Sequence, residues 1–216
     1  MLTILLTRHG HTQVSDPDRY LGQKIAAPLS ERGRLDAQAL ADRLESVAVD
    51  RIVSSPLERA RDTANILCAG RSTELDVDER LAEFDYGAWE GMGVEEVEQK
   101  LPDEHALYEA NPAIYHVGGA ENGLEASRRA LSLINDLLAW WGGNGDRTCL
   151  LVGHSSINRV LLAAVTDVPL ADYRRRFQQD WVNLTVLRWE SLDSGPLLVL
   201  VNDVAHIVGT TGNTWQ

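Results

Sequence analysis

Three residues suited to phosphate chemistry follow one another where an apolar segment ends. Residues 2–7 are mostly apolar and lead directly into Arg8, His9 and Gly10. A guanidinium offers a fixed fork of donors that matches phosphate oxygens, and a neutral imidazole is a nucleophile near neutral pH. Glycine lets the backbone approach a ligand closely. The three residues suggest phosphoryl transfer to His9, with the Gly10 carbonyl as a candidate partner for the second ring nitrogen.

Two further apolar runs end in polar residues. The run 51–53 leads into SSPLERARDTA at 54–64, which contains Arg59, and the run 149–151 leads into Val152-Gly153-His154. Ligands of open α/β sheets bind beyond the carboxyl ends of the strands. Phosphoryl transfer depends mainly on positioning and on stabilising charge on the equatorial oxygens. We therefore expect Arg8, Arg59 and His154 to form a phosphate clamp, whereas Arg61 points elsewhere on its helix.

These motifs, together with LAEFDYGAWEG at 81–91, resemble the histidine phosphatase superfamily, the phosphoglycerate-mutase-like group, in order and spacing from residue 2 to about residue 187. The resemblance implies that His9 is the nucleophile. It also implies that Glu83, the acid ahead of YGAWEG, is the general acid, with Asp85 and Glu90 as nearby alternatives. Burial and a phosphate dianion would help this carboxyl group to keep the proton that the leaving oxygen needs.

The resemblance bears on three more positions. It implies that Thr12 donates to the phosphate and that Gln23 contacts the substrate. His11 stands where the family usually has Glu or Gln, and we interpret it as substrate-facing or as polar packing. A metal held by His11, His154 and an aspartate is disfavoured, because paired carboxylates and a His-x-x-x-His spacing are missing. We expect no metal and no other cofactor.

Strand-like and helix-like segments alternate along the chain. This alternation favours an α/β fold, a three-layer doubly wound and mainly parallel sheet with helices on both faces. Ser30 is the predicted N-cap of one helix, and 55–58 is a predicted capping box with Pro56 at the first helical position. Strands are predicted over 2–7, 50–54, 74–78, 148–153, 184–189 and 197–202, and further helices over 124–141 and 156–166.

The chain is expected to form a single domain over 1–216, with an insertion at about 92–117 that caps the site. This insertion carries two short helix-like pieces broken by Pro102 and Pro112, and only one basic residue, Lys100. Its acids are Glu95, Glu96, Glu98, Asp103, Glu104 and Glu109. We expect these acids to repel a second negative charge on the substrate, which would favour the monoester of a neutral alcohol. Tyr108, Tyr115 and Trp89 are candidate apolar contacts for such a leaving group.

Net charge and cysteine use limit the partners. The formal charge of −12 argues against nucleic acid and against an anionic membrane, and leaves a small phosphomonoester or free phosphate as the ligand. Cys68 and Cys149 are typical of free thiols in a reducing compartment. The chain shows no signal peptide and no transmembrane run, so a cytoplasmic location is the default expectation. The sequence leaves open whether the chain forms a homo-oligomer.

The residues and the resemblance together predict a metal-independent phosphomonoester phosphatase that acts through a phosphohistidine intermediate. His9 attacks phosphorus, the clamp holds the oxygens, and Glu83 protonates the leaving oxygen and then serves as the base for water. One alternative is a cofactor-dependent phosphoglycerate mutase, which the acidic cap disfavours. Another is a non-catalytic phosphate-binding regulatory protein, against which the intact catalytic set argues.

Overall fold

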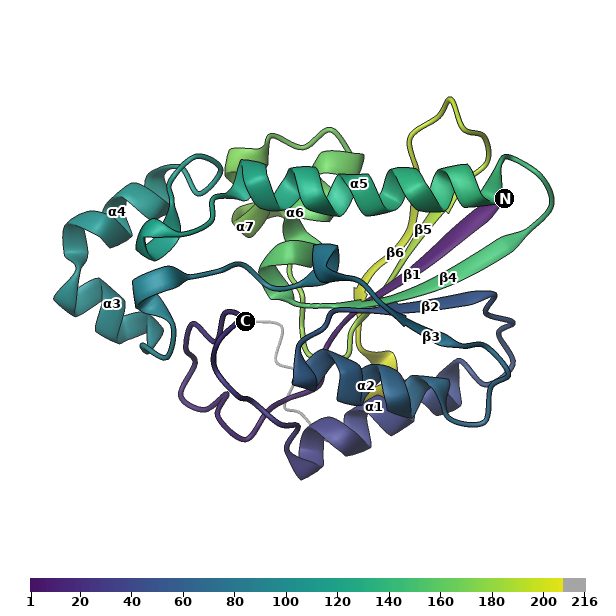
Figure 1. Ribbon diagram of the computed structural model, residues 1–216, viewed down its shortest axis with the longest axis horizontal. Helices are drawn as coiled ribbons and strands as arrows, with labels where there is room; N and C mark the ends of the chain where they lie inside the picture. Colours follow the sequence, from purple (N-terminus) through teal and green to yellow (C-terminus); the bar gives the residue numbers. More distant parts are fainter. Residues whose placement is uncertain (208–216) are drawn as a thin grey trace.

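The computed structural model describes residues 1–207 and is built on one six-stranded mixed sheet (Figure 1). The strand order is β3-β2-β4-β1-β5-β6. The first four of these strands are parallel, and β5 runs antiparallel to both β1 and β6. The strands are β1 (Leu2–Arg8), β2 (Arg51–Ser54), β3 (Leu75–Val77), β4 (Arg147–Gly153), β5 (Leu184–Trp189) and β6 (Leu197–Asp203). All six predicted strands are confirmed to within one residue at each end.

Helices cover both faces of the sheet, as predicted. In Figure 1, α1 (Glu31–Arg43) and α2 (Glu58–Cys68) lie on one face, and α5 (Gly123–Trp141) and α6 (Ser155–Val165) lie on the other. The short α7 (Tyr173–Arg176) packs against α6. The remaining helical turns are η1 (Glu79–Leu81), η2 (Gly87–Trp89), η3 (Val117–Gly119), η4 (Leu170–Asp172) and η5 (Ala205–Ile207).

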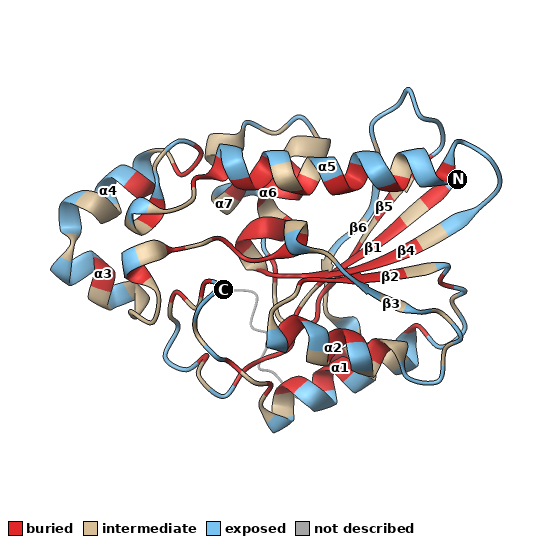
Figure 2. Cartoon of the chain, in the orientation of Figure 1, coloured by how far each residue is buried: buried red, intermediate tan, exposed pale blue. Residues whose placement is uncertain are grey.

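The alternation of side chains along the central strand divides the core in two. Leu2, Ile4 and Leu6 of β1 pack into the cluster beneath α5 and α6, whereas Leu5 packs into the cluster beneath α1 and α2. Successive residues of a strand point to opposite faces, so a strand covered on both faces is apolar throughout. Figure 2 shows the resulting band of buried residues through the central strands. This rigid sheet fixes the positions of the residues that follow its carboxyl ends.

The two predicted helix starts have different outcomes. Ser30 caps α1 as predicted, because its Oγ accepts the Gly33 amide proton at 3.1 Å. The capping box at 55–58 is wrong, since α2 begins only at Glu58 and no side chain caps it. The physical reason is that the Ser55 hydroxyl lies 2.7 Å from Nε2 of His154. The Ser55 hydroxyl therefore hydrogen-bonds to His154 and does not cap α2.

The insertion forms the two short helices that were predicted, α3 (Val94–Lys100) and α4 (Pro102–Ala110). Pro102 occupies the first turn of α4, where the missing amide proton costs nothing. Both helices lie beyond the carboxyl ends of the strands (Figure 1). Among the helices of residues 1–207, none has both the length and the apolar character needed to cross a membrane.

Candidate active site

Neighbouring strands bring the predicted residues together at one edge of the sheet. β4 pairs with β1 on one side and with β2 on the other, in parallel register up to the strand ends. His9 follows β1, His154 follows β4 and Ser55 follows β2. Because β4 is the middle strand, His154 lies between the other two residues. The strand order therefore assembles a site from three segments that are far apart in the sequence.

His9 is held as a neutral nucleophile. The side chain is buried, and its Nδ1–H donates to the Gly10 carbonyl at 2.7 Å, the partner suggested by the sequence. Burial, together with the positive charges of Arg59 and Arg8, lowers the pKa of His9 well below 6.5. With the proton on Nδ1, the lone pair of Nε2 is available. His9 also lines the cavity described below, so this nitrogen can attack a bound phosphoryl group.

Gly10 is required for close packing with a helix. A Cβ at this position would lie 2.7 Å from the Gly33 carbonyl oxygen of α1, which is a clash with backbone. The Gly10 amide donates to Oγ1 of Thr63 in α2 at 3.0 Å. The structure thus shows a packing reason for Gly10, and close approach of a ligand to its backbone stays a prediction. The glycine lets the strand end pack against α1 and so fixes His9.

His154 is fully buried and lies beside the nucleophile, with its ring centroid 5.0 Å from that of His9. Its Nε2 lies 2.7 Å from the Ser55 hydroxyl, which also accepts the Leu57 amide proton at 3.3 Å. A hydroxyl has one proton, and Ser55 is free to donate it to Nε2. Burial and then Arg59 lower the pKa of His154 well below 6.5. Donation from Ser55 to Nε2 would place the ring proton on Nδ1, which is buried and has no partner among residues 1–207.

Two buried arginines flank the histidines. Arg59 donates from Nη2 to the Gly22 carbonyl at 2.7 Å, and Arg8 donates from Nη1 to the Gln179 carbonyl at 2.8 Å. The Arg8 guanidinium also lies 5.0 Å from the centre of the Trp181 ring. In both arginines Nε is buried without a partner. Desolvation by burial, the largest of several effects, lowers the pKa of Arg8 to about 10, so it stays charged at neutral pH. These guanidiniums retain unused donors for phosphate oxygens.

Glu83 lies at the amino end of α6 and lines the same cavity. Its carboxylate accepts the amide protons of Ser156 at 3.1 Å and of Ile157 at 3.0 Å. The first amides of a helix have no partner within the helix, so an acidic side chain is stabilised there. A third bond, from the Phe84 amide at 3.0 Å, completes the set. Backbone groups hold Glu83 in one orientation toward the cavity.

The two alternatives to Glu83 lie elsewhere. Asp85 pairs with Lys24, whose Nζ is 3.0 Å from its carboxylate. Glu90 accepts backbone amide protons from Gln23 and Lys24 at 2.9 and 2.8 Å. Neither carboxylate belongs to the cavity wall. Among the three candidate acids, Glu83 alone is placed to reach a substrate.

The cavity has a volume of about 180 Å³ and is rich in arginine. Its basic residues are Arg8, Arg19, Arg59, Arg159 and Arg174, its acids are Asp18 and Glu83, and His9, Ser155, Ser156, Tyr20, Tyr86, Tyr108, Leu21, Gly22 and Val94 complete the wall. A protein with a net charge of −12 thus presents a locally basic pocket. Such a pocket attracts phosphate esters against the field of the whole molecule.

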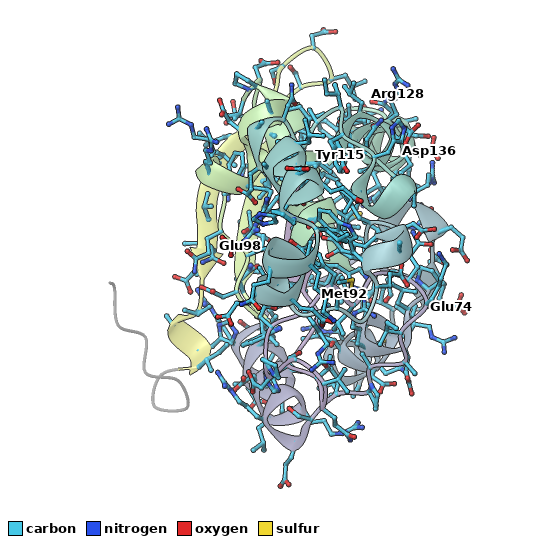
Figure 3. The ribbon with its side chains drawn as sticks, turned by 90° about the vertical axis from the view of Figure 1, so that its left-hand side faces the viewer. Glu74, Met92, Glu98, Tyr115, Arg128 and Asp136 are labelled. Carbon is cyan, nitrogen blue, oxygen red and sulfur yellow. The ribbon has the colours of Figure 1, made fainter. Side chains whose placement is uncertain are left out.

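The acids of the insertion do not face this cavity. The insertion contributes Val94 and Tyr108 to the wall, and none of its six acids. Figure 3 views the insertion from its free end and labels Glu98, which is exposed. These acids therefore do not form the wall that a ligand would contact, and the expected repulsion of a second negative charge stays a prediction. The position of these acids in the sequence of the insertion did not determine which of them line the cavity.

Of the three candidate aromatic contacts, Tyr108 alone lines the cavity. Trp89 is completely buried in the core, and its Nε1 donates to Glu104 at 3.3 Å. Tyr115 also contacts Glu104, through its hydroxyl at 3.5 Å. Trp89 and Tyr115 serve packing rather than substrate contact.

The wall of the cavity does not include Thr12, Gln23 or Arg61. Thr12 is fully buried, with its hydroxyl 2.7 Å from the Ser15 hydroxyl. Gln23 is exposed and donates from Nε2 to the Glu83 carbonyl at 2.8 Å, so it supports the Glu83 segment. In this structure neither Thr12 nor Gln23 takes the predicted place beside a substrate. Arg61 is exposed, as expected for a structural residue.

His11 is polar packing, one of the two interpretations of the sequence. Its Nδ1 lies 2.8 Å from the Ser30 hydroxyl and its Nε2 lies 3.0 Å from the Asp16 carboxylate. Its ring meets the Trp181 ring edge-on, with centroids 4.6 Å apart. Across residues 1–207, no three side chains of His, Cys, Asp or Glu converge in a way that would hold a metal ion.

Sequence reasoning missed a support beneath Glu83. Arg129 of α5 donates to the carbonyls of Ala82 and Glu83 at 2.7 and 3.2 Å, and Glu121 holds the Arg129 guanidinium at 2.7 Å. Glu121 lies in the loop that directly precedes α5. Its carboxylate therefore has a positioning role here. Only the packing of α5 against the 80–85 segment reveals it.

Comparison with known proteins identifies the family of the chain. The family model described as the histidine phosphatase superfamily (branch 1) matches residues 4–204. Phosphoserine phosphatase 1 of Hydrogenobacter thermophilus is 29% identical over 173 residues, which cover 80% of each chain. Glucosyl-3-phosphoglycerate phosphatase of Mycobacterium tuberculosis is 32% identical over 175 residues, covering 79% of this chain and 78% of the relative.

Solved structures agree over nearly the full length. Bacillus stearothermophilus YhfR superposes with a TM-score of 0.84 at 31% identity, covering 96% of this chain and all of that one. A mycobacterial glucosyl-3-phosphoglycerate phosphatase in complex with VO3 gives a TM-score of 0.83 at 27% identity, covering 93% and 99% of the two chains. The strand-end histidines, the arginines and the whole-chain match lead to one conclusion: the chain belongs to the histidine phosphatase superfamily, branch 1.

Proposed function

We propose that this protein hydrolyses small phosphomonoesters through a phosphohistidine on His9. The observation that carries the proposal is the state of that side chain: neutral, locked by the Gly10 carbonyl, and exposed to a basic cavity through Nε2. The predicted phosphatase class is confirmed by the family and by the named relatives. Their names also support a small-molecule phosphate as the substrate class.

The first step forms the bond between phosphorus and Nε2 of His9 and breaks the ester bond. Arg8, Arg59 and the Nδ1–H of His154 stabilise the charge that spreads over the equatorial oxygens. Glu83 gives a proton to the leaving oxygen. Removal of the charge from that oxygen makes an alcohol, rather than an alkoxide, the leaving group.

The second step releases phosphate. A water molecule attacks phosphorus from the side that the alcohol has left, Glu83 accepts its proton, and the bond to Nε2 breaks. The same carboxyl group is therefore acid and then base, as microscopic reversibility requires. The same clamp serves both steps, because both pass through a transferring phosphoryl group. No step needs a metal ion.

The chain organisation that accompanies this proposal is a single domain over 1–216, with the 92–117 insertion as its cap. Both cysteines of the described chain are free, which supports the proposed cytoplasmic location. The formal net charge of −12 supports a small phosphate ligand rather than nucleic acid or an anionic membrane. Oligomerisation is left to measurement.

Trapping the intermediate tests the proposal. Brief reaction of the wild type with a ³²P-labelled monoester, followed by alkaline quenching, should leave acid-labile label on His9. His9→Ala should give neither label nor turnover of p-nitrophenyl phosphate. His11→Asn is the matched control, because His11 follows the same strand but lies outside the cavity wall, and it should keep the label. Substantial turnover by His9→Ala would rule out the mechanism.

A further inference from the structure

Arg8 lines the cavity without an ion pair to hold it in place. Its Nε is buried without a hydrogen bond, and no carboxylate among residues 1–207 pairs with its guanidinium. The positive charge of Arg159, which lines the same cavity, repels that of Arg8: after burial, it does most to lower the pKa of Arg8. Repulsion of this kind favours displacement of a long side chain, so other contacts must keep the guanidinium in place.

Two residues outside the cavity wall contact the Arg8 guanidinium. Its Nη1 donates to the Gln179 carbonyl at 2.8 Å, and its carbon atom Cζ lies 5.0 Å from the centre of the Trp181 ring. A guanidinium within about 6 Å of an indole ring centre is attracted by the π-electrons of the ring. Neither Gln179 nor Trp181 lines the cavity. Both lie in the segment between α7 and β5.

This segment is fastened to the strand that carries Arg8. Val182 has a φ of 53°, and its amide donates to the Arg8 carbonyl at 3.1 Å. A β-branched residue in the left-handed region is strained, and such residues persist where their surroundings fix them, often at functional sites. Asn158 also ties Gln179 to β1, because its Nδ2 donates to the Gln179 side chain and to the Thr7 carbonyl, each at 3.1 Å. Arg8 therefore meets a fixed support.

The chemistry of this support suits a guanidinium that must bind phosphate. A contact with an aromatic ring takes up none of the N–H donors of arginine, whereas a carboxylate would take up two of them. Nε1 of Trp181 is buried and has no partner among residues 1–207. A buried donor without a partner is unfavourable, so packing alone would be better served by phenylalanine. Indole is, however, the aromatic ring that attracts a cation most strongly.

We propose that Trp181 is a positioning residue of the phosphate clamp. Its ring and the Gln179 carbonyl hold the Arg8 guanidinium against the charge of Arg159, which leaves the remaining donors of Arg8 directed at the transferring phosphoryl group. Trp181 does not touch the substrate and acts through Arg8. This inference rests on the proposed phosphatase function and deepens it, because it names a residue outside the cavity on which the rate depends.

Substitution of the ring tests the proposal. Trp181→Leu should lower kcat for p-nitrophenyl phosphate about tenfold, a factor within the range of a cation–π contact, and change KM by less than about threefold. Trp181→Phe keeps an aromatic ring and should recover most of the lost rate. Thermal unfolding establishes that both variants are folded. A phenylalanine variant as slow as the leucine variant, with a wild-type Tm, would count against the proposal.

Trp140→Leu is the matched control. Trp140 of α5 has two arginines near its ring, Arg51 at 6.0 Å and Arg147 at 5.9 Å from the ring centre. Neither of these arginines lines the cavity. Trp140→Leu should therefore keep the wild-type kcat. A loss of rate equal to that of Trp181→Leu would show that the effect does not depend on Arg8.

A double-mutant cycle shows whether Trp181 acts through Arg8. Arg8→Gln alone should lower kcat by about 10²–10³, the usual cost of one donor to a developing charge. In that background Trp181→Leu should lower kcat by no more than about twofold, because no guanidinium remains to be positioned. Factors that multiply in the double variant would overturn the proposal and make Trp181 a packing residue.

Binding of orthovanadate separates this inference from the phosphatase proposal. Vanadate bonded to a nucleophile resembles the transferring phosphoryl group, with three equatorial oxygens, and calorimetry of its binding needs no turnover. Trp181→Leu should raise the Kd of vanadate about tenfold and that of inorganic phosphate by less than about threefold. Equal changes in the two Kd values would refute the role of Trp181. A wild type without turnover would refute the phosphatase, and the Kd values would still decide the role of Trp181.

Discussion

Replacement of Glu83 by glutamine separates chemistry from folding in this site. Oε1 of Glu83 accepts the amide protons of Phe84 and Ile157, and Oε2 accepts that of Ser156. Glutamine keeps only one acceptor oxygen. Its side-chain NH₂ then takes the place of Oε2, so two donors, this NH₂ and the Ser156 N–H, face each other. A buried donor left unsatisfied costs about 1–3 kcal/mol. For a chain of this size each kcal/mol lowers Tm by about 2–4 °C, so Glu83→Gln should unfold roughly 2–12 °C below wild type.

The kinetic effect of Glu83→Gln should depend on the leaving group. Loss of general acid catalysis costs about 10²–10⁴ in rate, and it matters most when the leaving oxygen is a poor one. We expect a loss of this size in kcat/KM for glycerol 3-phosphate and a much smaller loss for p-nitrophenyl phosphate. The comparison uses kcat/KM because this parameter extends only to formation of the phosphoenzyme, and so excludes the step in which Glu83 acts as base.

Glu90→Gln is the matched control for this prediction. Glu90 also accepts three amide protons, those of Gln23 and Tyr86 on Oε1 and that of Lys24 on Oε2, but it lies outside the cavity wall. It should lower Tm by a comparable amount and change both kcat/KM values by the same small factor. Equal losses on the alkyl and aryl esters in Glu83→Gln would refute the role of Glu83 as general acid and leave it a positioning residue.

Three further predictions concern the groups around the nucleophile. Ser55→Ala should lower kcat about 10- to 100-fold, because His154 loses the hydrogen bond that fixes which ring nitrogen carries the proton. Ser54→Ala is the control, since it loses only a bond to the Ser55 carbonyl and should keep the wild-type kcat. Similar kcat values for the two variants would refute this role of Ser55. Burial lowers the pKa of both His9 and His154, so the unfolded chain binds protons that the native one does not, and the free energy of unfolding should fall as pH drops below about 6.5, by up to about 1.4 kcal/mol per pH unit for each histidine. Urea titrations between about pH 7.5 and 5.5 should show a flatter dependence in His9→Asn, and an unchanged slope would contradict the buried neutral state. Arg129→Gln should lower both Tm and kcat, because it removes the hydrogen bonds that hold the Glu83 segment. Arg128 is an exposed neighbour on α5 (Figure 3), and Arg128→Gln should change neither quantity. A wild-type kcat in Arg129→Gln would show that the Glu83 segment keeps its position without Arg129.

Much of the fold follows from local patterns in the sequence. Apolar runs bounded by polar residues predict all six strands, and the central strands are apolar because helices cover both faces of the sheet there. The strand-end positions of His9 and His154 are equally local, since each follows directly on such a run. The predicted roles of Glu83 and Arg59 depended on the family resemblance as much as on the local sequence pattern.

The arrangement around these residues is a property of the tertiary structure. The Ser55 hydroxyl could cap α2 by its sequence, yet strand order places it beside His154, and the hydrogen bond goes there. Likewise, six acids in one insertion predict an acidic cap, but none of them lines the cavity, whereas Arg159 and Arg174 join its wall from α6 and α7. Charge in a sequence is a sum over residues, whereas the field in a cavity depends on which side chains face it and at what distance. The sequence by itself determined the strands and the nucleophile, and only the fold decided which charges the substrate meets.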